Sequence, residues 1–146
     1  MIALPPVLYA GAFLIVVVLQ VIAPLRITTF AVGVTAGLAL IAAGLALARW
    51  GRRTMVAAGT NVNPTLPSTA VVTSGPFRYT RNPLYVALTL FFLGLTLIAN
   101  SYWGVVALAP LLVVMHFGVV RREERYLERK FGDGYRRYQS TVRRYF

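Results

Sequence analysis

The sequence predicts an all-α integral membrane protein with about four transmembrane helices and a C-terminal amphipathic helix in the cytoplasm. Of its 146 residues, 58% are hydrophobic and only 13% are charged. Such a composition leaves too little polar surface to cover a globule of this size, so lipid must cover the chain instead. Its long uncharged stretches approach the roughly 20 residues that a helix needs to cross a bilayer. We therefore treat residues 1–146 as one membrane domain.

The predicted spans follow one another as two pairs. They cover about residues 4–24, 27–48, 84–99 and 102–120. The third is short, and a tilt or a thin local bilayer can accommodate the difference. Pro24 ends the first span, and Thr28 and Thr29 can cap the second, so the first two spans are expected to form a tight hairpin. Asn100 and Ser101 mark the turn between the last two spans.

The basic residues predict the orientation in the membrane. Of the 15 Lys and Arg, five lie between Arg49 and Arg81 and nine lie from Arg121 onward. The positive-inside rule places both segments in the cytoplasm. An even number of spans then leaves both termini there. The N-terminal segment has no charged region beyond its α-amino group and no small-residue cleavage site, so we interpret it as a retained helix and not a signal peptide.

Charge and residue usage exclude several classes of function. The net charge of +11 comes from arginines at the ends of spans, which favours anionic membrane lipids as partners and argues against nucleic acid. Without Cys and with one His, the chain cannot build a thiolate or multi-histidine metal site. It also lacks a glycine-rich dinucleotide loop. Any cofactor must therefore bind among helix ends and loops.

Two other patterns predict packing. Gly33 and Gly37 have the four-residue spacing that allows close helix approach, and we expect this face of the second span to pack against the first span or a second subunit. In the tail, an apolar stripe recurs at spacings of four, four and three residues. It consists of Leu127, Phe131, Tyr135 and Tyr138. The stripe favours a single helix lying on the membrane.

Two motifs carry a family resemblance. The first is G-P-F-R-Y-T-R-N-P-L-Y at residues 75–85. The second is E-E-R-Y-L-E at residues 123–128, followed by F-G-D-G-Y-R-R-Y at residues 131–138. With two spans between these motifs, the chain resembles a small prokaryotic-type member of the isoprenylcysteine carboxyl methyltransferase and phospholipid N-methyltransferase superfamily over roughly residues 58–146.

The resemblance implies a methyltransferase of a prokaryotic plasma membrane that uses S-adenosyl-L-methionine. Its substrate would be a carboxylate or an amine of a lipid-like or prenylated molecule. The resemblance also implies that the C-terminal tail closes over the pocket as a lid. A short chain of this kind can require a homodimer to seal its cavity on the lipid side.

The cofactor site is expected where the motifs meet, at residues 75–85 and 116–138. A helix that begins at Pro83 favours a carboxylate at its N-terminus, Asn82 can cap that helix, and Arg81 can hold the same carboxylate. By resemblance, at least one of Glu123 and Glu124 receives the ammonium or the ribose of the cofactor. The predicted set is Tyr79, Arg81, Asn82, Pro83, Tyr85, His116, Glu123, Glu124, Tyr135 and Tyr138.

The catalytic candidates are Arg78, His116 and Glu124. Arg78 can hold a carboxylate acceptor, whereas an amine acceptor needs a base, which His116 or a glutamate can supply. His116 lies seven residues before Glu123, so on a continuous α-helix the two project roughly 20° apart and can line one pocket.

These residues also have structural interpretations. Arg81 beside a Pro-initiated helix is typical of a snorkelling side chain. Glu123 and Glu124 can pair with basic residues three or four positions away, although Glu128 is an unfavourable neighbour of Glu124. His116 suits helix packing as well as it suits a site.

Two other functions stay open at the level of the sequence. Sterol reductases share a similar terminal segment, so a reductase that uses NADPH is one alternative. A polybasic membrane scaffold without a cofactor is the other. Binding of a cofactor, either S-adenosylhomocysteine or NADPH, distinguishes the three.

Overall fold

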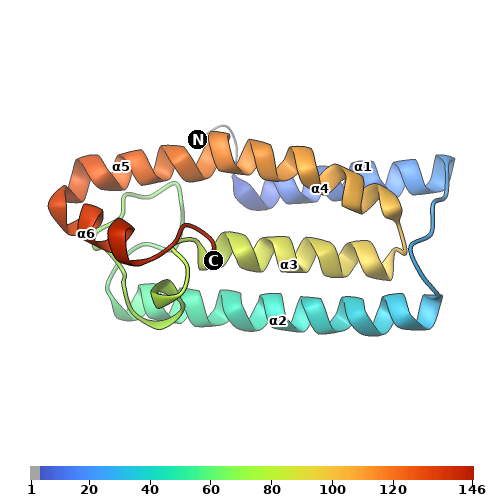
Figure 1. The fold of residues 1–146 in the computed structure, drawn as a ribbon, viewed down its shortest axis with the longest axis horizontal. Helices are drawn as coiled ribbons and strands as arrows, with labels where there is room; N and C mark the ends of the chain where they lie inside the picture. The colour runs from blue at the N-terminus through green and yellow to red at the C-terminus, as the bar shows by residue number, and fades with distance from the viewer. Residues whose placement is uncertain (1–3) are drawn as a thin grey trace.

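The computed structural model describes residues 4–146, and every regular element within that range is helical. The elements are α1 (Pro5–Ile22), α2 (Phe30–Ala57), the 3₁₀ helix η1 (Gly75–Arg78), α3 (Pro83–Ile98), α4 (Tyr102–Met115), the π-helix η2 (His116–Val120), α5 (Arg121–Phe131) and α6 (Asp133–Thr141). Figure 1 shows that α4, η2 and α5 form one continuous rod.

Three helical segments are long and apolar enough to cross a membrane, and α3 is a shorter apolar helix. The three segments are Pro5–Ile22, Phe30–Ala57 and Tyr102–Phe131. Large apolar side chains such as Val21 and Phe30 are about three-quarters exposed on the outer faces, as expected for surfaces that face lipid. The predicted all-α membrane fold is confirmed.

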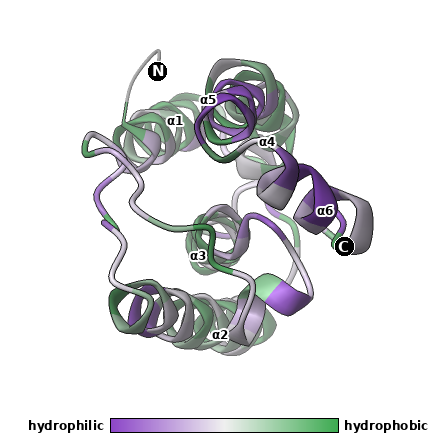
Figure 2. Ribbon diagram, turned by 90° about the vertical axis from the view of Figure 1, so that its left-hand side faces the viewer, coloured by the Kyte–Doolittle hydropathy of each residue, from purple (hydrophilic) through white to green (hydrophobic). Residues whose placement is uncertain are grey.

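The predicted tight hairpin of the first two spans is wrong. Helix α3 lies between α2 on one side and α1 with α4 on the other (Figures 1 and 2). Helices α1 and α2 are therefore consecutive in the chain, but α3 separates them. The reason is that the glycine face of α2 accepts α3, which leaves α1 to pack on α3 and α4.

The glycine face of α2 thus has a different partner from either of the two predicted ones. A Cβ atom on Gly37 would lie 2.6 Å from the carbonyl oxygen of Gly94, and one on Gly33 would lie 2.6 Å from that of Leu97. Gly44 makes the same kind of approach to Ala87. The backbones of α2 and α3 are therefore in direct contact, which only a residue without a Cβ permits.

The buried core lies on the other side of α3, where α1, α3, α4 and η2 meet. Its members are Tyr9, Val16, Phe92, Leu111, Met115 and Val119. The hydroxyl of Tyr9 is 2.7 Å from that of Thr89, so the one polar group in this cluster has a hydrogen-bond partner on α3. Aromatic edges of Tyr9 and Phe13 pack against the ring of Phe92.

Two predicted boundaries differ from the structure. Helix α2 continues nine residues beyond the predicted end at residue 48 and reaches Ala57, because arginine and alanine are good helix formers once outside the apolar layer. The predicted single tail helix is two helices, α5 and α6, since Gly132 between them has a positive φ of 54°. The chain consequently reverses at Gly132. Leu127 and Phe131 of the apolar stripe therefore lie on α5, whereas Tyr135 and Tyr138 lie on α6.

Asn100 joins the two turns at the opposite end of the bundle. Its Oδ1 accepts hydrogen bonds of 2.9 Å from the amides of Ile27 and Thr28, and its Nδ2 donates to the carbonyl of Thr28 at 2.7 Å. Its φ of 49° is a left-handed conformation, which Asn adopts more readily than Ala. The side chain therefore fixes the entry into α2.

An Asn100→Ala variant is expected to unfold at a lower temperature. The loss of three hydrogen bonds and the unfavourable φ should cost roughly 2 kcal/mol, or about 4–8 °C in the thermal midpoint of the detergent-solubilised protein followed by circular dichroism. The control is Asn63→Ala, which removes bonds only to Thr65 in the same turn. Equal losses in both variants would contradict the role assigned to Asn100.

Candidate functional site

A small cleft lined by both charged and apolar residues lies among the segments that gather at one end of the molecule. Figure 1 shows this end, from which α5 projects. The segment 60–72, the start of α3, and helices α5 and α6 enclose the cleft, and its volume is about 70 Å³. The polar and aromatic residues of its wall come largely from the two motifs. They are Thr60, Ser68, Phe77, Arg81, Asn82, Glu123, Glu124, Tyr135 and Tyr138.

The N-terminus of α3 forms one side of the cleft, as the motif predicts. Pro83 occupies the first turn and Asn82 the N-cap position. The side chain of Asn82 does not cap the helix, however. Its Nδ2 donates a 2.9 Å hydrogen bond to the carbonyl of Arg144, and the hydroxyl of Thr80 donates to the same oxygen at 3.1 Å. The expected cap is thus corrected: Asn82 binds the C-terminal segment instead.

Glu124 is the most enclosed charge in the cleft, with 8% of its side chain exposed. Arg144 donates to it from Nε at 3.0 Å and from Nη2 at 2.8 Å, a two-pronged ion pair. Arg81 places Nη1 3.1 Å from its Oε1. The alternative in which Glu124 pairs with basic residues on its own exposed helix is therefore wrong. Both partners come from distant parts of the chain.

The guanidinium of Arg81 is buried, with 10% of its side chain exposed. Its Nη1 is in charge contact with Glu124, but neither Nη1 nor Nε has a hydrogen-bond partner with suitable geometry among residues 4–146. Buried N–H groups without a partner are costly and rare in native proteins. Their position on the wall of a cleft indicates that these donors are available to an anion.

Glu123 is held from the opposite side by Tyr85. The hydroxyl of Tyr85 donates a 2.6 Å hydrogen bond to its Oε2. Two neighbouring glutamates therefore have different partners: Glu124 neutralises two arginines, whereas Glu123 accepts from a neutral phenol. The structure brings the two predicted residues together: Glu123 lines the cleft, and Tyr85 contacts it from behind the lining.

Helix α6 folds back over the cleft, so the stripe does not form the single lipid-facing surface that its spacing favoured, and its two tyrosines are buried in the protein. Tyr135 is 2% and Tyr138 7% exposed. The hydroxyl of Tyr138 donates to the carbonyl of Phe77 at 2.7 Å. Burial and the nearby Glu124 carboxylate raise the pKa of Tyr135 to about 12. Tyr135 therefore stays protonated at neutral pH and can donate a hydrogen bond.

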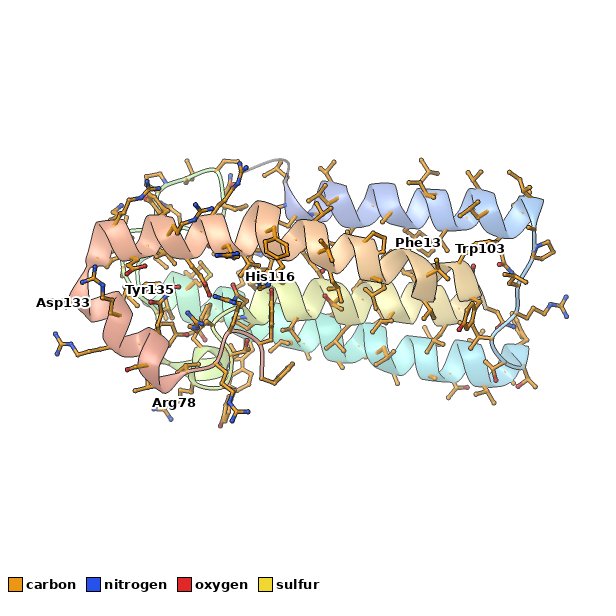
Figure 3. All side chains as sticks on the ribbon, turned by 45° about the horizontal axis from the view of Figure 1, so that its top comes forward. Phe13, Arg78, Trp103, His116, Asp133 and Tyr135 are labelled. Carbon is orange, nitrogen blue, oxygen red and sulfur yellow. The ribbon has the colours of Figure 1, made fainter. Side chains whose placement is uncertain are left out.

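Five predicted site residues do not line this cleft. Two of them adjoin it, since Pro83 follows Asn82 in the chain and Tyr85 donates to Glu123. The other three lie farther away. Arg78 is exposed at the outer edge of the same end of the molecule, apart from Tyr135 (Figure 3). Tyr79 is 66% exposed, and its ring centroid is 6.4 Å from that of Trp50. His116 has Nδ1 3.0 Å from the hydroxyl of Tyr145 and does not line the cleft.

The π-helix explains why His116 and Glu123 do not share a pocket. The seven-residue spacing places two side chains on one face only if every turn is α-helical. Residues His116–Val120 form a wider π turn, which changes the angular position of everything that follows. Turns of this kind are frequent next to functional sites. No feature of the local sequence distinguishes this turn from an ordinary helix.

Arg144 is the main site residue that the sequence analysis missed. It belongs to a short basic run at the end of the chain, which is typical of a solvated tail. The structure instead anchors this segment by a backbone bond of 3.0 Å from the amide of Arg81 to the carbonyl of Arg143. The composition did contain a signal. The chain has four acidic residues and 15 basic ones, so a buried Glu124 is expected to form an ion pair with an arginine.

The fold and the cleft define a helical membrane protein with a cleft that holds charged residues at one end of its bundle. The chain belongs to the phospholipid methyltransferase family, whose model matches residues 32–134. This family is part of the isoprenylcysteine and phospholipid methyltransferase group, so the resemblance noted in the sequence is confirmed. The family places the chain among membrane methyltransferases of that type.

One curated relative and the solved structures complete the comparison. Over 63 residues the chain is 44% identical to an uncharacterized protein of Haemophilus influenzae, a match that covers 42% of this chain and 98% of that protein. No solved structure matches the chain.

Proposed function

We propose that the protein transfers a methyl group from S-adenosyl-L-methionine to an amine or a carboxylate of a lipid-like acceptor at the membrane interface. The observation that carries this proposal is the pair of buried groups in the cleft, the carboxylate of Glu124 and the guanidinium of Arg81. The two groups are in charge contact, but Nε of Arg81 has no hydrogen-bond partner within residues 4–146. The methionine part of the cofactor has one carboxylate and one ammonium. The guanidinium of Arg81 can therefore bind the carboxylate of the cofactor, and the carboxylate of Glu124 can bind its ammonium.

The residues present fit this cofactor in kind. The carboxylate would accept from Nε and Nη1 of Arg81 and would lie near the N-terminus of α3, where the helix dipole favours an anion. Glu124 would take the ammonium or a ribose hydroxyl. Tyr135 and Tyr138 offer ring faces to the adenine or to the sulfonium cation, and a cation over such a ring gains about 0.5–2 kcal/mol.

The cleft must widen before the cofactor can enter. Its volume of about 70 Å³ is well below the roughly 300 Å³ at which pockets for small molecules begin. The C-terminal segment is the part that has to move, because Arg144 already occupies Glu124 with its own cation. The ammonium of the cofactor would replace the guanidinium of Arg144. The predicted lid function of the tail is consistent with this exchange.

When bound, the cofactor supplies the electrophilic methyl group, and the protein supplies orientation, exclusion of water and the protonation state of the acceptor. An amine must lose a proton before it can attack. Glu123 is our candidate base, since its carboxylate lines the cleft and accepts from a neutral phenol rather than from an arginine. A carboxylate acceptor needs no base. Glu123 comes three residues after Val120, where the apolar part of the α4–η2–α5 rod ends. This position places its carboxylate near the depth of a lipid headgroup.

Calorimetric titration of the detergent-solubilised protein tests the proposal. S-adenosylhomocysteine, the demethylated product, is expected to bind with micromolar affinity, and NADPH is expected not to bind. Transfer of a labelled methyl group into a total lipid extract would then identify the acceptor. Binding of NADPH alone would instead favour the reductase. The absence of binding by both would leave the scaffold as the function.

A further inference from the structure

Two residues of the first motif, Arg78 and Tyr79, have no place in the cleft. They lie on the flank of the molecule where η1 meets the end of α2. This flank holds a second hollow, an open groove of about 400 Å³. Its lining residues are Arg53, Thr54, Ala57, Ala58, Ser74 and Gly75, none of which lines the cleft.

We propose that this groove binds the phosphate of an anionic phospholipid headgroup. The site is separate from the cleft and does not depend on the proposed methyl transfer. The name headgroup groove is used below for the lining residues just given together with Arg49, which precedes Arg53 by one turn on α2. The bound lipid would be a resident of the membrane that fixes the depth and tilt of α2.

The first support is an excess of uncompensated positive charge. Arg49, Arg53 and Arg78 are all exposed, and within residues 4–146 no carboxylate lies within ion-pair distance of any of them. The acidic residues all lie between residues 123 and 133, at the cleft and on the outer side of α5 and α6. Arg53 in the lining of the groove, and the two arginines near it in the chain or on η1, therefore have no internal anion to neutralise them.

The second support is the position of these cations along α2. The apolar part of the helix ends at residue 48, and Arg49 and Arg53 follow on one face, about 6 Å apart along the axis. This is where a helix leaves the hydrocarbon and enters the headgroup layer. Arginine binds phosphate through two parallel N–H donors, which suits it to a headgroup at this depth better than a point charge.

The third support is an aromatic pair at the same level. The rings of Trp50 and Tyr79 lie 6.4 Å apart, and both side chains are about half or more exposed. Trp and Tyr concentrate at the boundary between hydrocarbon and water. Trp50 lies next to Gly75 in the wall of the groove, so the groove, with Arg53 in its lining, adjoins the residues that mark the interface. Ala57 and Ala58 contribute small side chains to the lining.

The fourth support is that the wall of the groove is built rigidly. Gly75 has a φ of 57°, and a Cβ atom there would lie 2.5 Å from the hydroxyl of Thr54 and 3.2 Å from Nε1 of Trp50. η1 is therefore pressed directly against α2. Ser74 also lines the groove, and its hydroxyl can donate a hydrogen bond to a phosphate. The hydroxyl of Thr54 already donates to the carbonyl of Trp50 at 2.9 Å, which fixes this side chain in the wall.

Native mass spectrometry of the detergent-purified protein, with phosphatidylglycerol and phosphatidylcholine added in equal amounts, tests this site. Wild type is expected to retain phosphatidylglycerol preferentially. The double variant Arg49→Gln with Arg53→Gln should lose at least about tenfold of that affinity, because two arginine–phosphate contacts are removed. Glycerol 3-phosphate should not displace the lipid, since it lacks the chains that hold the headgroup at the groove.

The matched control is the double variant Arg129→Gln with Arg137→Gln, which loses the same charge from exposed positions at the same end of the molecule. It should retain phosphatidylglycerol as wild type does. Equal retention by the Arg49 and Arg53 variant, or an equal loss in the control, would overturn the site. Displacement by glycerol 3-phosphate would show instead a site for free phosphate.

The experiment is independent of the methyltransferase proposal. Within residues 4–146 the side chains of Arg49 and Arg53 make no hydrogen bond or ion pair and are exposed, so the thermal midpoint of their variant should equal that of wild type. If S-adenosylhomocysteine binds wild type, it should bind this variant equally well. If the variant loses phosphatidylglycerol but still binds S-adenosylhomocysteine, the defect lies in the groove alone. If it keeps the lipid but loses S-adenosylhomocysteine, the defect lies in the cleft.

Discussion

Replacing Glu124 by Gln is expected to abolish binding of S-adenosylhomocysteine and to destabilise the protein. The variant keeps the shape of the side chain but removes the charge that neutralises Arg81 and Arg144. Removing one partner of a buried ion pair typically costs about 3–5 kcal/mol, because the other charge stays buried and unpaired. Since Arg144 is about one-third exposed, we expect the lower end, roughly 3 kcal/mol.

The two effects can be measured on one preparation. The thermal midpoint should fall by roughly 6–12 °C, and calorimetry should show no heat of S-adenosylhomocysteine binding. Glu128→Gln is the matched control, since Glu128 is an acidic residue of the same helix whose partner Arg136 is exposed. It should change neither property measurably. Unaltered cofactor affinity in the Glu124 variant would remove Glu124 from the site.

Replacing Gly37 by Ala is expected to be nearly as damaging, although Gly37 lies far from the cleft. The new methyl group would lie 2.6 Å from the carbonyl oxygen of Gly94 and 2.6 Å from Cγ1 of Ile98. The carbonyl belongs to the backbone of α3 and cannot rotate away. Helices α2 and α3 must therefore separate along their contact, and overpacking of this kind costs roughly 3 kcal/mol.

The control for Gly37 is Gly11→Ala on α1. A Cβ atom on Gly11 has nothing within 4 Å, and Ala is the better helix former by about 1 kcal/mol. Circular dichroism should show a midpoint lower by several degrees for Gly37→Ala and unchanged or higher for Gly11→Ala. Equal midpoints for the two variants would mean that α2 and α3 are not in the direct contact described.

The sequence predicted the class of fold well because hydrophobic length is a one-dimensional property. The four apolar stretches, the Pro83 start of α3 and the turn at Asn100 all follow from local composition. The spans could be located in this way because a helix in lipid must satisfy its own backbone hydrogen bonds, whatever its neighbours are. The family was also readable, since the two motifs occur in order with two spans between them.

Only the tertiary structure decided which helices touch. The sequence paired α1 with α2 because they are consecutive, whereas the glycines of α2 are in contact with α3. A small-residue face predicts that some helix approaches closely, but it does not specify the partner. The same limit applied to the tail, where the turn at Gly132 reversed the chain and turned Tyr135 and Tyr138 inward.

The site shows the same division. The motifs identified Arg81, Asn82, Tyr85 and Glu124, residues whose chemistry is local. The sequence by itself therefore determined the fold class, the family and most of the charged groups of the cleft. The structure decided that Arg144 pairs with Glu124, that the π turn moves His116 away from the cleft, and that Arg78 is exposed outside the cleft. Arg144 and Glu124 are 20 positions apart, and the bond from Thr80 to the same C-terminal segment spans 64 positions. Such pairings depend on packing energies that no local pattern encodes.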